Sequence, residues 1–296
     1  MGITKKDCQL LFYSKRTMDV DFRKTLMLGR LQLYVTKAEI VKFVNQYINE
    51  KSPDVDFKDE YAEPLFKILG ADEVDSLDYS NYEKATIIHD LNQHLPSIHR
   101  AAYTCVVDGG TIEHVFNFPV AIRNCMEALK VGGHYIGITP ANNQMGHGFY
   151  QFSPELYYRV FSEENGFRVK KMFITPGNQL NEWYEVADPA QVKSRVMLVN
   201  NCPLTLIMVA EKISEREPFA QTPYQSDYST SWIRGQPLSE GERSGGTAMA
   251  KRIYQQVVPS RLRIIARNVY DLYKTEKVDT DNFGTLNPKH YKKIII

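Results

Sequence analysis

Three residues in this sequence have the types and spacing expected of an acid–base site: Glu113, His114 and His147. A histidine titrates near neutral pH and can take a proton from a hydroxyl group, and a neighbouring carboxylate can orient the ring or act as a second acid. His147 stands between two glycines, where a packing role is hard to assign. We therefore predict His114 and His147 as catalytic residues with Glu113 as their partner. The alternative for His114 is that it is the first polar residue of the helix that follows.

Glu113 and His114 come shortly after a predicted strand. The buried apolar run Tyr103–Val107 stops at Asp108-Gly-Gly110, and the acid and the histidine follow within a few residues. Ligands of α/β sheets bind at the carboxyl ends of the strands, because the loops there vary while the strands beneath hold them in place. The pattern therefore places Glu113 and His114 at the ligand-binding edge of a sheet.

Strands and helices alternate along most of the chain. The strand Thr25–Arg30 is followed by a helix over 36–48, which Thr36 and Glu39 begin with a capping box. We expect further strands at 71–78, 85–92, 103–108, 134–140, 167–174 and 196–211. We expect further helices at 5–20, 60–69, 118–129 and 154–164, and a turn at 130–133. The alternation predicts βαβ units and a parallel sheet covered by helices.

Composition excludes several classes of protein. Lysines and arginines number 36 against 35 acids, so no overall field attracts DNA. The four cysteines are widely spaced and form no metal-binding pair, which favours reduced thiols in a cytoplasmic protein. The apolar run at 203–210 is too short to span a bilayer.

The texture of the sequence changes after Ile213. We predict one domain over 1–213, a linker or long loop over 214–246 and a basic helical extension over 247–296. From residue 242 to the end there are 11 basic and 5 acidic side chains. This excess of basic residues predicts peripheral contact with an anionic surface. The sequence does not predict an oligomeric state.

The order of these features resembles the class I S-adenosylmethionine-dependent methyltransferases, from about Leu26 to Glu211. The motifs that carry the resemblance are Asp78 after the second strand, Asp90-Leu91 after the third, Glu113-His114 after the fourth, Leu129-Lys-Val-Gly-Gly133 and Asn165-Gly-Phe167. The resemblance implies a Rossmann-like, mostly parallel seven-stranded sheet flanked by helices, here with a C-terminal helical extension. It also implies S-adenosyl-L-methionine as the cofactor.

The resemblance places this cofactor against the ends of the first four strands. The residues expected to contact it are Leu28, Gly29, Arg30, Asp78, Tyr79, Asp90, Leu91, Asn92, Asp108, Gly109 and Gly110. A carboxylate can accept both ribose hydroxyls, which suits Asp78, and an oxygen acceptor suits Asp90 beside the adenine amino group. Roles as helix caps or turn formers are the alternatives for both acids. The short turn Leu28-Gly-Arg30 departs from the family's glycine-rich loop, and there Arg30 is expected to pair with the methionine carboxylate.

Aromatic and amide side chains surround the predicted acceptor side and favour a hydroxyl-rich ligand such as a sugar or glycan. They are Phe116, Asn142, Asn143, Phe149 and Tyr150. Packing in the core is the alternative for the aromatic rings. Some small-RNA 2′-O-methyltransferases of the family bind a divalent metal through Glu-xx-Glu-His and a later histidine. This chain is similar at Glu113, His114 and His147 but has Gly110 in the first position, so Mg²⁺ is a secondary expectation.

The function predicted from the sequence is O-methylation of a small hydroxylated acceptor, such as a sugar, nucleotide-sugar or glycan. The alternative is a catalytically inactive methyltransferase-like protein that acts as a binding or scaffolding module. A nicotinamide-dependent enzyme is disfavoured because no GxGxxG follows the first strand. An RNA methyltransferase stays open because the C-terminal residues are basic, although they match no RNA-binding module.

Overall fold

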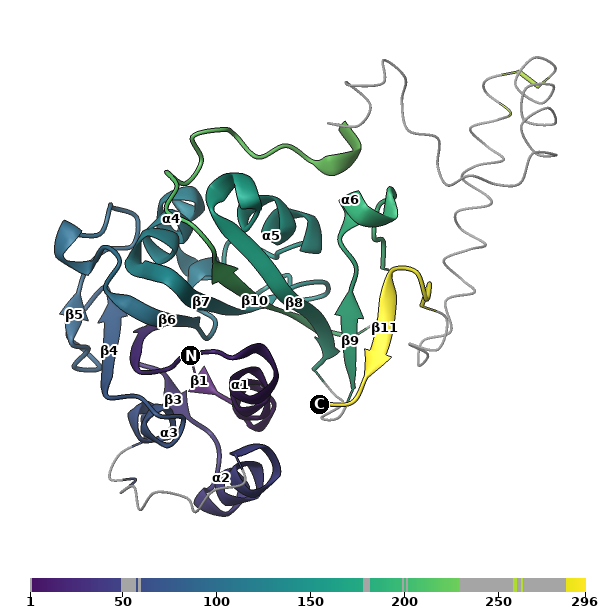
Figure 1. Cartoon of the computed structure of the whole chain (residues 1–296). Coiled ribbons are helices and arrows are strands. Elements are labelled where there is room, and N and C mark those ends of the chain that lie inside the picture. The colour runs from purple at the N-terminus through teal and green to yellow at the C-terminus, as the bar shows by residue number, and fades with distance from the viewer. Residues whose placement is uncertain are drawn as a thin grey trace.

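A computed structural model describes residues 2–48, 57, 60–177, 182–198, 200, 202–228, 258, 259, 262 and 286–296 of the chain. In these residues nine strands form one mixed sheet in the order β11-β9-β8-β10-β7-β6-β2-β4-β5 (Figure 1). The strands are β2 (Lys24–Leu28), β4 (Glu73–Asp78), β5 (Ile87–Ile88), β6 (Tyr103–Asp108), β7 (Leu129–Pro140), β8 (Phe167–Pro176), β9 (Trp183–Val186), β10 (Leu204–Lys212) and β11 (Tyr291–Ile294). Two short strands, β1 (Gly2–Ile3) and β3 (Gln32–Leu33), pair separately.

The sheet confirms the α/β class but corrects the prediction of seven mostly parallel strands. Five neighbours, β5, β4, β2, β6 and β7, pair in parallel. From β7 onwards, β10, β8, β9 and β11 each pair antiparallel with the strand before them. The antiparallel half is made by late segments that return across the sheet, and its two outermost strands have only four residues each. Strands this short carry too little alternation to be recognised in a sequence.

Helices cover both faces of the sheet. Helices α1 (Lys5–Met18), α2 (Lys37–Phe43) and α3 (Glu63–Ile68) lie on one face, and α4 (Phe118–Ala128) and α5 (Pro154–Val160) lie on the other (Figure 1). A short helix, α6 (Pro189–Val192), follows β9. The predicted capping box of Thr36 and Glu39 is confirmed. In the structure, the side chain of Ser153 also caps α5. The helix after Thr36 changes at Val44 to a π-helix that ends at Ile48.

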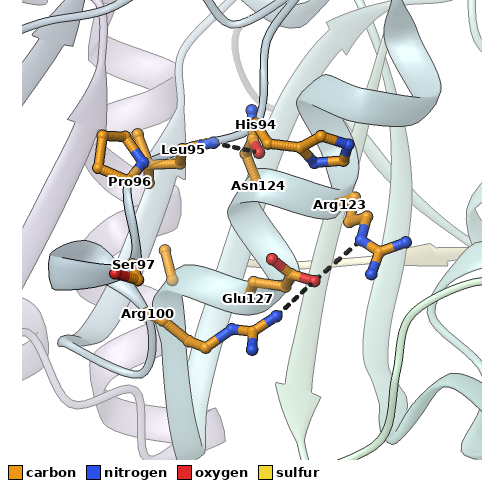
Figure 2. Close-up of a pocket in the computed structure, with 9 residues that line it drawn as sticks. His94, Leu95, Pro96, Ser97, Arg100, Arg123, Asn124 and Glu127 are labelled. Carbon is orange, nitrogen blue, oxygen red and sulfur yellow. Dashed lines mark hydrogen bonds and ion pairs between the residues drawn. The ribbon is translucent and has the colours of Figure 1, made fainter.

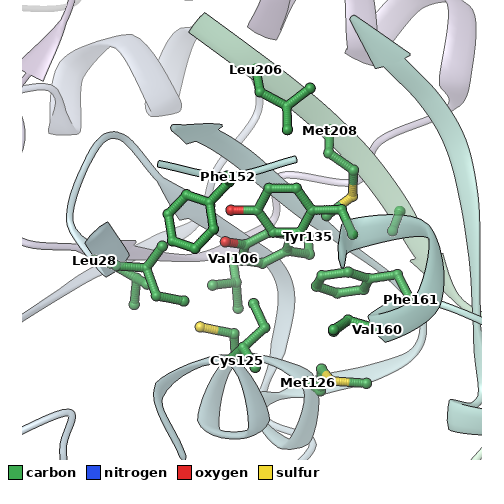
Figure 3. Close-up of a cluster of buried hydrophobic side chains, with 14 of the residues drawn as sticks. Leu28, Val106, Cys125, Met126, Tyr135, Phe152, Val160, Phe161, Leu206 and Met208 are labelled. Carbon is green, nitrogen blue, oxygen red and sulfur yellow. The ribbon is translucent and has the colours of Figure 1, made fainter. Parts of the chain in front are cut away.

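The strands separate two hydrophobic clusters because their side chains alternate between faces. In β2, Leu26 and Leu28 face the cluster under α4 and α5, whereas Met27 faces the cluster under α1, α2 and α3. In β6, Val106 faces the first cluster and Val107 the second. Figure 3 shows the first cluster, where strand side chains meet residues of α4 and α5. Burial on both faces makes the central strands continuous apolar runs, which is why the sequence revealed them.

Several boundaries differ from the sequence-based expectations. Leu129-Lys-Val-Gly-Gly133 was expected to form a turn, but it is the beginning of β7, and the pairing of β7 with β6 is irregular there. The strand expected at 196–211 begins only at Leu204. The strand expected at 85–92 is reduced to Ile87–Ile88, and the helix expected to reach Glu164 ends at Val160 before a turn of 3₁₀-helix.

The C-terminal extension lies almost entirely outside the described residues, so the proposed division into domain, linker and extension stays a prediction. Its last part is described and is not helical. Residues Tyr291–Ile294 form β11, which pairs with β9 at the edge of the main sheet. No helix of the described residues is long and apolar enough to cross a membrane.

We predict that β11 contributes to the stability of the sheet. Tyr291 is 6% exposed and belongs to the core cluster under α4 and α5. Replacing Tyr291 with alanine should therefore lower the free energy of unfolding by about 2–4 kcal/mol, measured by urea denaturation. The matched control is Lys292→Ala on the same strand, which is exposed and should change stability by no more than about 0.5 kcal/mol. Equal effects of the two substitutions would contradict the placement of β11.

Candidate active site

The predicted catalytic residues come from two neighbouring strand ends. Glu113 and His114 lie in the 3₁₀ turn Ile112–His114, which follows β6. His147 lies in the loop that follows β7, and β6 and β7 pair in parallel. Because parallel strands end at the same edge of a sheet, the two loops meet there. This edge also borders the point where the strand order reverses, since β2 lies between β4 and β6.

Glu113, His114 and His147 form one cluster. The Oε1 atom of Glu113 lies 3.2 Å from Nε2 of His147. The ring centroids of His114 and His147 are 5.2 Å apart. One side-chain nitrogen or oxygen from each of the three residues lies within 4.8 Å of the other two. The structure therefore brings together the three residues that the sequence indicated, although they come from separate loops.

Asp108 shapes the turn that presents Glu113 and His114. Its Oδ1 accepts hydrogen bonds from the backbone N–H groups of Thr111 and Ile112, at 2.8 and 3.3 Å. Its Oδ2 accepts one from the hydroxyl of Tyr135 at 3.0 Å. The side chain is fully buried, and this burial raises the pKa of Asp108 to about 6. The Asp108 carboxylate is thus bound by groups of the protein itself, and contact of Asp108 with the cofactor stays a prediction.

Glu113 is a buried carboxyl group at the base of the cluster. It is 1% exposed, and among the described residues its Oε2 atom has no hydrogen-bond partner. Burial, with a smaller contribution from the nearby Asp108 carboxylate, raises the pKa of Glu113 to about 8. Burial and the neighbouring His147 lower the pKa of His114. At neutral pH the free protein therefore keeps Glu113 protonated and His114 neutral, and a neutral imidazole can accept a proton.

Two glycines allow the loops to close around Glu113. A Cβ atom on Gly148 would lie 2.8 Å from the carbonyl oxygen of Glu113, and φ at Gly148 is +75°. A Cβ atom on Gly110, where φ is +92°, would lie 3.2 Å from Oε1 of Glu113. The N–H of Phe149 donates to the carbonyl of Glu113 at 2.8 Å and fixes the second loop. The glycines beside His147 are visible in the sequence, but this close approach depends on the fold.

The residues expected to bind the cofactor lie along four adjacent strand ends. Asp78 ends β4, Asp90 follows β5, Gly29 follows β2 and Gly110 follows β6. Asp78 and Asp90 are half-buried and cap local turns, because Asp78 accepts from the N–H of Ser80 and Asp90 from the N–H and side chain of Asn92. The hydrogen bonds from Asn92 lower the pKa of Asp90. Both acids therefore stabilise local turns, which was the alternative role predicted for them. Both also lie at the edge of the sheet where the cofactor was predicted to bind.

The remaining predicted cofactor residues differ in exposure. Leu28 and Leu91 are buried, whereas Tyr79 is 76% exposed. Gly29 adopts φ of +74° and donates its N–H to the carbonyl of Leu77. A Cβ atom on Gly109 would lie 2.9 Å from the side chain of Leu31, so this glycine is required for packing.

Arg30 has partners within the protein. Its Nε donates to the carboxylate of Glu63 at 2.7 Å, and an N–H of its guanidinium donates to the carbonyl of Glu83 at 3.1 Å. The guanidinium also lies 3.9 Å from the ring centroid of Tyr61. These contacts tie the turn after β2 to two neighbouring loops. Pairing of Arg30 with a methionine carboxylate stays a prediction that no contact in the structure tests.

The predicted acceptor residues fall into two groups. Phe116 and Phe149 are 72% and 66% exposed and pack edge to face with ring centroids 5.8 Å apart. The hydroxyl of Tyr150 donates to the carbonyl of Phe116. In contrast, the amide nitrogens of Asn142 and Asn143 donate to backbone carbonyls of residues 198, 200 and 202. These two amides hold the loop through their Nδ2 atoms, and the ligand contact expected for them stays a prediction.

A cavity of about 400 Å³ lies apart from the cluster, between residues 94–100 and α4 (Figure 2). None of the residues predicted to act in the site lines it. Its polar wall holds Glu127 between Arg100 and Arg123, at 3.0 and 2.9 Å. The cavity therefore does not mark the candidate site.

No protein-family model matches this sequence, and no curated protein sequence matches it either. Among solved structures, the chain is similar to a SAM-dependent methyltransferase from Archaeoglobus fulgidus, with a TM-score of 0.39 and 12% identity over 69% of this chain and 94% of that one. It is also similar to 1,6-didemethyltoxoflavin-N1-methyltransferase from Burkholderia thailandensis, with a TM-score of 0.38 and 9% identity over 71% and 80% of the two chains. At these identities and TM-scores the likenesses carry no argument about function.

The raised pKa of Glu113 predicts how stability depends on pH. The ordinary pKa of a glutamate is 4.5 and that of folded Glu113 is about 8. Between these values the folded state holds more protons than the unfolded state, so the free energy of unfolding should fall as pH rises, by up to about 1.4 kcal/mol per pH unit. Urea denaturation at pH 5 to 8 measures this slope.

The variant Glu113→Gln keeps the shape of the side chain and removes the ionisation. It should lose stability less steeply than the wild type over the same pH range. Asp108 titrates in both proteins and its charge contributes to the raised pKa of Glu113, so the difference between the two curves reports the ionisation of Glu113 together with this interaction. Parallel curves would mean that Glu113 is ionised normally in the folded chain.

Proposed function

We propose that this chain is an S-adenosylmethionine-dependent O-methyltransferase that acts on a small hydroxylated acceptor. The observation that carries the proposal is the cluster of Glu113, His114 and His147 beyond the carboxyl end of β6. It lies next to the point where the strand order of the parallel half reverses, which is where α/β sheets of this order bind ligands. Proton acceptors at that place suit a reaction in which a hydroxyl group must lose its proton.

The cofactor edge supports this proposal. Asp78 and Asp90 lie beyond two adjacent strands with carboxylates that can accept hydroxyl or amino hydrogens. Gly29 and Gly110 adopt positive φ beyond the next two strands; Gly29 is buried, whereas Gly110 is half-buried and, without a side chain, would let a ligand approach its backbone. When bound, S-adenosylmethionine supplies an electrophilic methyl group and leaves as S-adenosylhomocysteine.

Residues of the chain itself can accept the proton that the hydroxyl group of the methyl acceptor loses. His147 is half-exposed beside the buried Glu113, so its ring can meet an acceptor while its Nε2 atom is held at 3.2 Å from the carboxyl group. His114 is the second possible proton acceptor, and the lowered pKa of its ring keeps the imidazole neutral. One of these imidazoles would accept the proton that the hydroxyl group of the methyl acceptor loses.

The surroundings of the cluster favour an acceptor with a flat face. Phe116 and Phe149 are exposed beside the two histidines, and such rings stack on the apolar faces of sugars or on planar groups. A sugar, nucleotide-linked sugar or glycan therefore remains our proposed acceptor class. The amides that the sequence suggested as its partners hold the loop, so the aromatic pair is the main support.

A divalent metal also fits the cluster. Its three donor atoms lie within 4.8 Å of one another, and the buried Oε2 of Glu113 has no partner among the described residues. Two imidazoles and one carboxylate suit Zn²⁺, Fe²⁺ or Mn²⁺ better than Mg²⁺, which prefers oxygen ligands. A metal held by Glu113, His114 and His147 would lower the pKa of a bound hydroxyl group. We therefore include an optional metal in the proposal, with Mg²⁺ as the weaker candidate.

One observation favours the second candidate function, a methyltransferase-like binding module without activity. The turn after β2 lacks the family's glycine-rich loop, and Arg30 in it contacts Glu63, Glu83 and Tyr61. A protein that no longer binds the cofactor could keep this arrangement. Calorimetric titration with S-adenosylhomocysteine separates the two functions, because only the enzyme requires this ligand.

Substitution of His147 tests the catalytic proposal. The variant His147→Ala should lower kcat about 100-fold or more while the affinity for S-adenosylhomocysteine changes less than about twofold, because the ring acts on the acceptor. Transfer of a labelled methyl group to a panel of sugars and nucleotide-sugars measures the rate. The control is His290→Ala, whose ring lies 2.9 Å from the hydroxyl of Ser194 beside β11, at the far edge of the sheet, and should leave the rate unchanged. If the wild type does not bind S-adenosylhomocysteine, the enzyme proposal fails.

Metal removal gives an independent prediction. The full chain, treated with a chelator, should bind one Zn²⁺ or Mn²⁺ per chain in calorimetry and bind Mg²⁺ more weakly. The variants Glu113→Gln and His114→Gln should each weaken this binding about tenfold or more, whereas His94→Ala should not. Equal metal binding by the wild type and both cluster variants would show that the cluster holds no metal.

A further inference from the structure

Residues 90–95, which include the predicted adenine contacts, depend on polar contacts to hold them in place. Asp90, Leu91 and Asn92 follow β5, and the chain then continues over the cavity between residues 94–100 and α4 (Figure 2). A cavity leaves side chains without packing partners on that side. The segment must therefore be held in place by specific hydrogen bonds or ion pairs.

Asn124 of α4 supplies three of these hydrogen bonds. Its Oδ1 accepts from the N–H of Leu95 at 2.9 Å, which Figure 2 shows at the edge of the cavity. Its Nδ2 donates to the carbonyls of Gln93 at 2.8 Å and Leu91 at 3.4 Å. The side chain is buried, with 2% of Asn124 exposed. A buried amide is unfavourable unless it is hydrogen-bonded, and the partners of Asn124 here are backbone groups of the segment.

Asn117 provides a second attachment to the same segment. Its N–H donates to Oδ1 of Asn92 at 2.9 Å, and its side chain donates to the carbonyl of Asn92 at 3.3 Å. Asn117 is the residue before α4 and precedes Asn124 by two helical turns, so both face the segment from the same side of the helix. Asn92 in turn donates two hydrogen bonds to Asp90.

We infer that Asn124 and Asn117 are positioning residues that hold residues 90–95 in the shape that binds the nucleoside part of the cofactor. Helix α4, which follows the turn of Glu113 and His114, thereby holds this segment both at its start, through Asn117, and further along its length, through Asn124. The cofactor and acceptor sides of the site would then be aligned by one rigid element. The effect on cofactor affinity rests on the proposed function, whereas the attachment of the segment does not.

The variant Asn124→Leu tests this inference, because it fills a similar volume and removes all three hydrogen bonds. Hydrogen exchange of the full chain should show loss of protection at the N–H of Leu95, at least about tenfold. The affinity for S-adenosylhomocysteine should fall about tenfold, measured by calorimetry well below the melting temperature. The KM for S-adenosylmethionine should rise while kcat at saturation changes little, because Asn124 does not touch the reacting atoms. The exposed Asn117→Ala should weaken affinity in the same direction with little change in stability.

Asn165 offers a matched control far from the cofactor edge. It is 4% exposed, donates to the carbonyl of Val160 at 2.9 Å and accepts from the N–H of Phe219 at 2.9 Å. Asn165→Leu should lower stability but leave the affinity for S-adenosylhomocysteine unchanged. Equal loss of affinity in both variants would show that instability alone is the cause and would overturn the inference, as would unchanged affinity and unchanged exchange in Asn124→Leu. Absence of binding by the wild type overturns the proposed function instead, and the exchange result then decides whether Asn124 holds the segment.

Discussion

The arrangement of the site depends on the hydrogen bonds that the buried Asp108 carboxylate accepts. At the end of β6 the chain must turn while its next N–H groups are already out of contact with water. Asp108 accepts two of them, from Thr111 and Ile112, and uses its other oxygen for the hydroxyl of Tyr135. An apolar residue at this position would leave these groups without partners, at a cost comparable to a lost hydrogen bond for each. The turn fixed in this way directs Glu113 inwards and His114 outwards.

The turn that Asp108 fixes places a second acid, Glu113, close to Asp108. Glu113 is buried near Asp108, so both carboxyl groups have raised pKa values, and each disfavours ionisation of the other. The arrangement is unfavourable for a free carboxylate but becomes favourable when a proton or a cation is held beside it. A protonated imidazole of His147 and a metal ion are the two such groups that the geometry admits. Such locally unfavourable electrostatic interactions are typical of functional sites, because the surrounding structure holds together groups that would otherwise separate.

Helix α4 connects this acid-containing turn with the rest of the edge. It begins directly after the turn, packs its apolar side into the cluster shown in Figure 3 and holds the segment after β5 through Asn117 and Asn124. A rigid helix can set the distance between two loops that do not contact each other strongly. The site thus consists of two loops that follow strands of the sheet and one helix that aligns these loops.

The sequence by itself determined the parallel half of the fold and indicated the three residues that meet in the candidate site. Runs such as Val106–Val107 are apolar on both faces, so they predict buried strands, and the acids, glycines and histidine that follow them must lie at one edge. Only the tertiary structure decided how these residues are used. Asp108, Asn142 and Asn143 bind the protein's own backbone, because a polar side chain's partner depends on what the fold brings within 3 Å or so. The meeting of His147 with Glu113 through Gly148, and the addition of β11 beyond β9, join segments distant in the chain, and such contacts leave no local pattern.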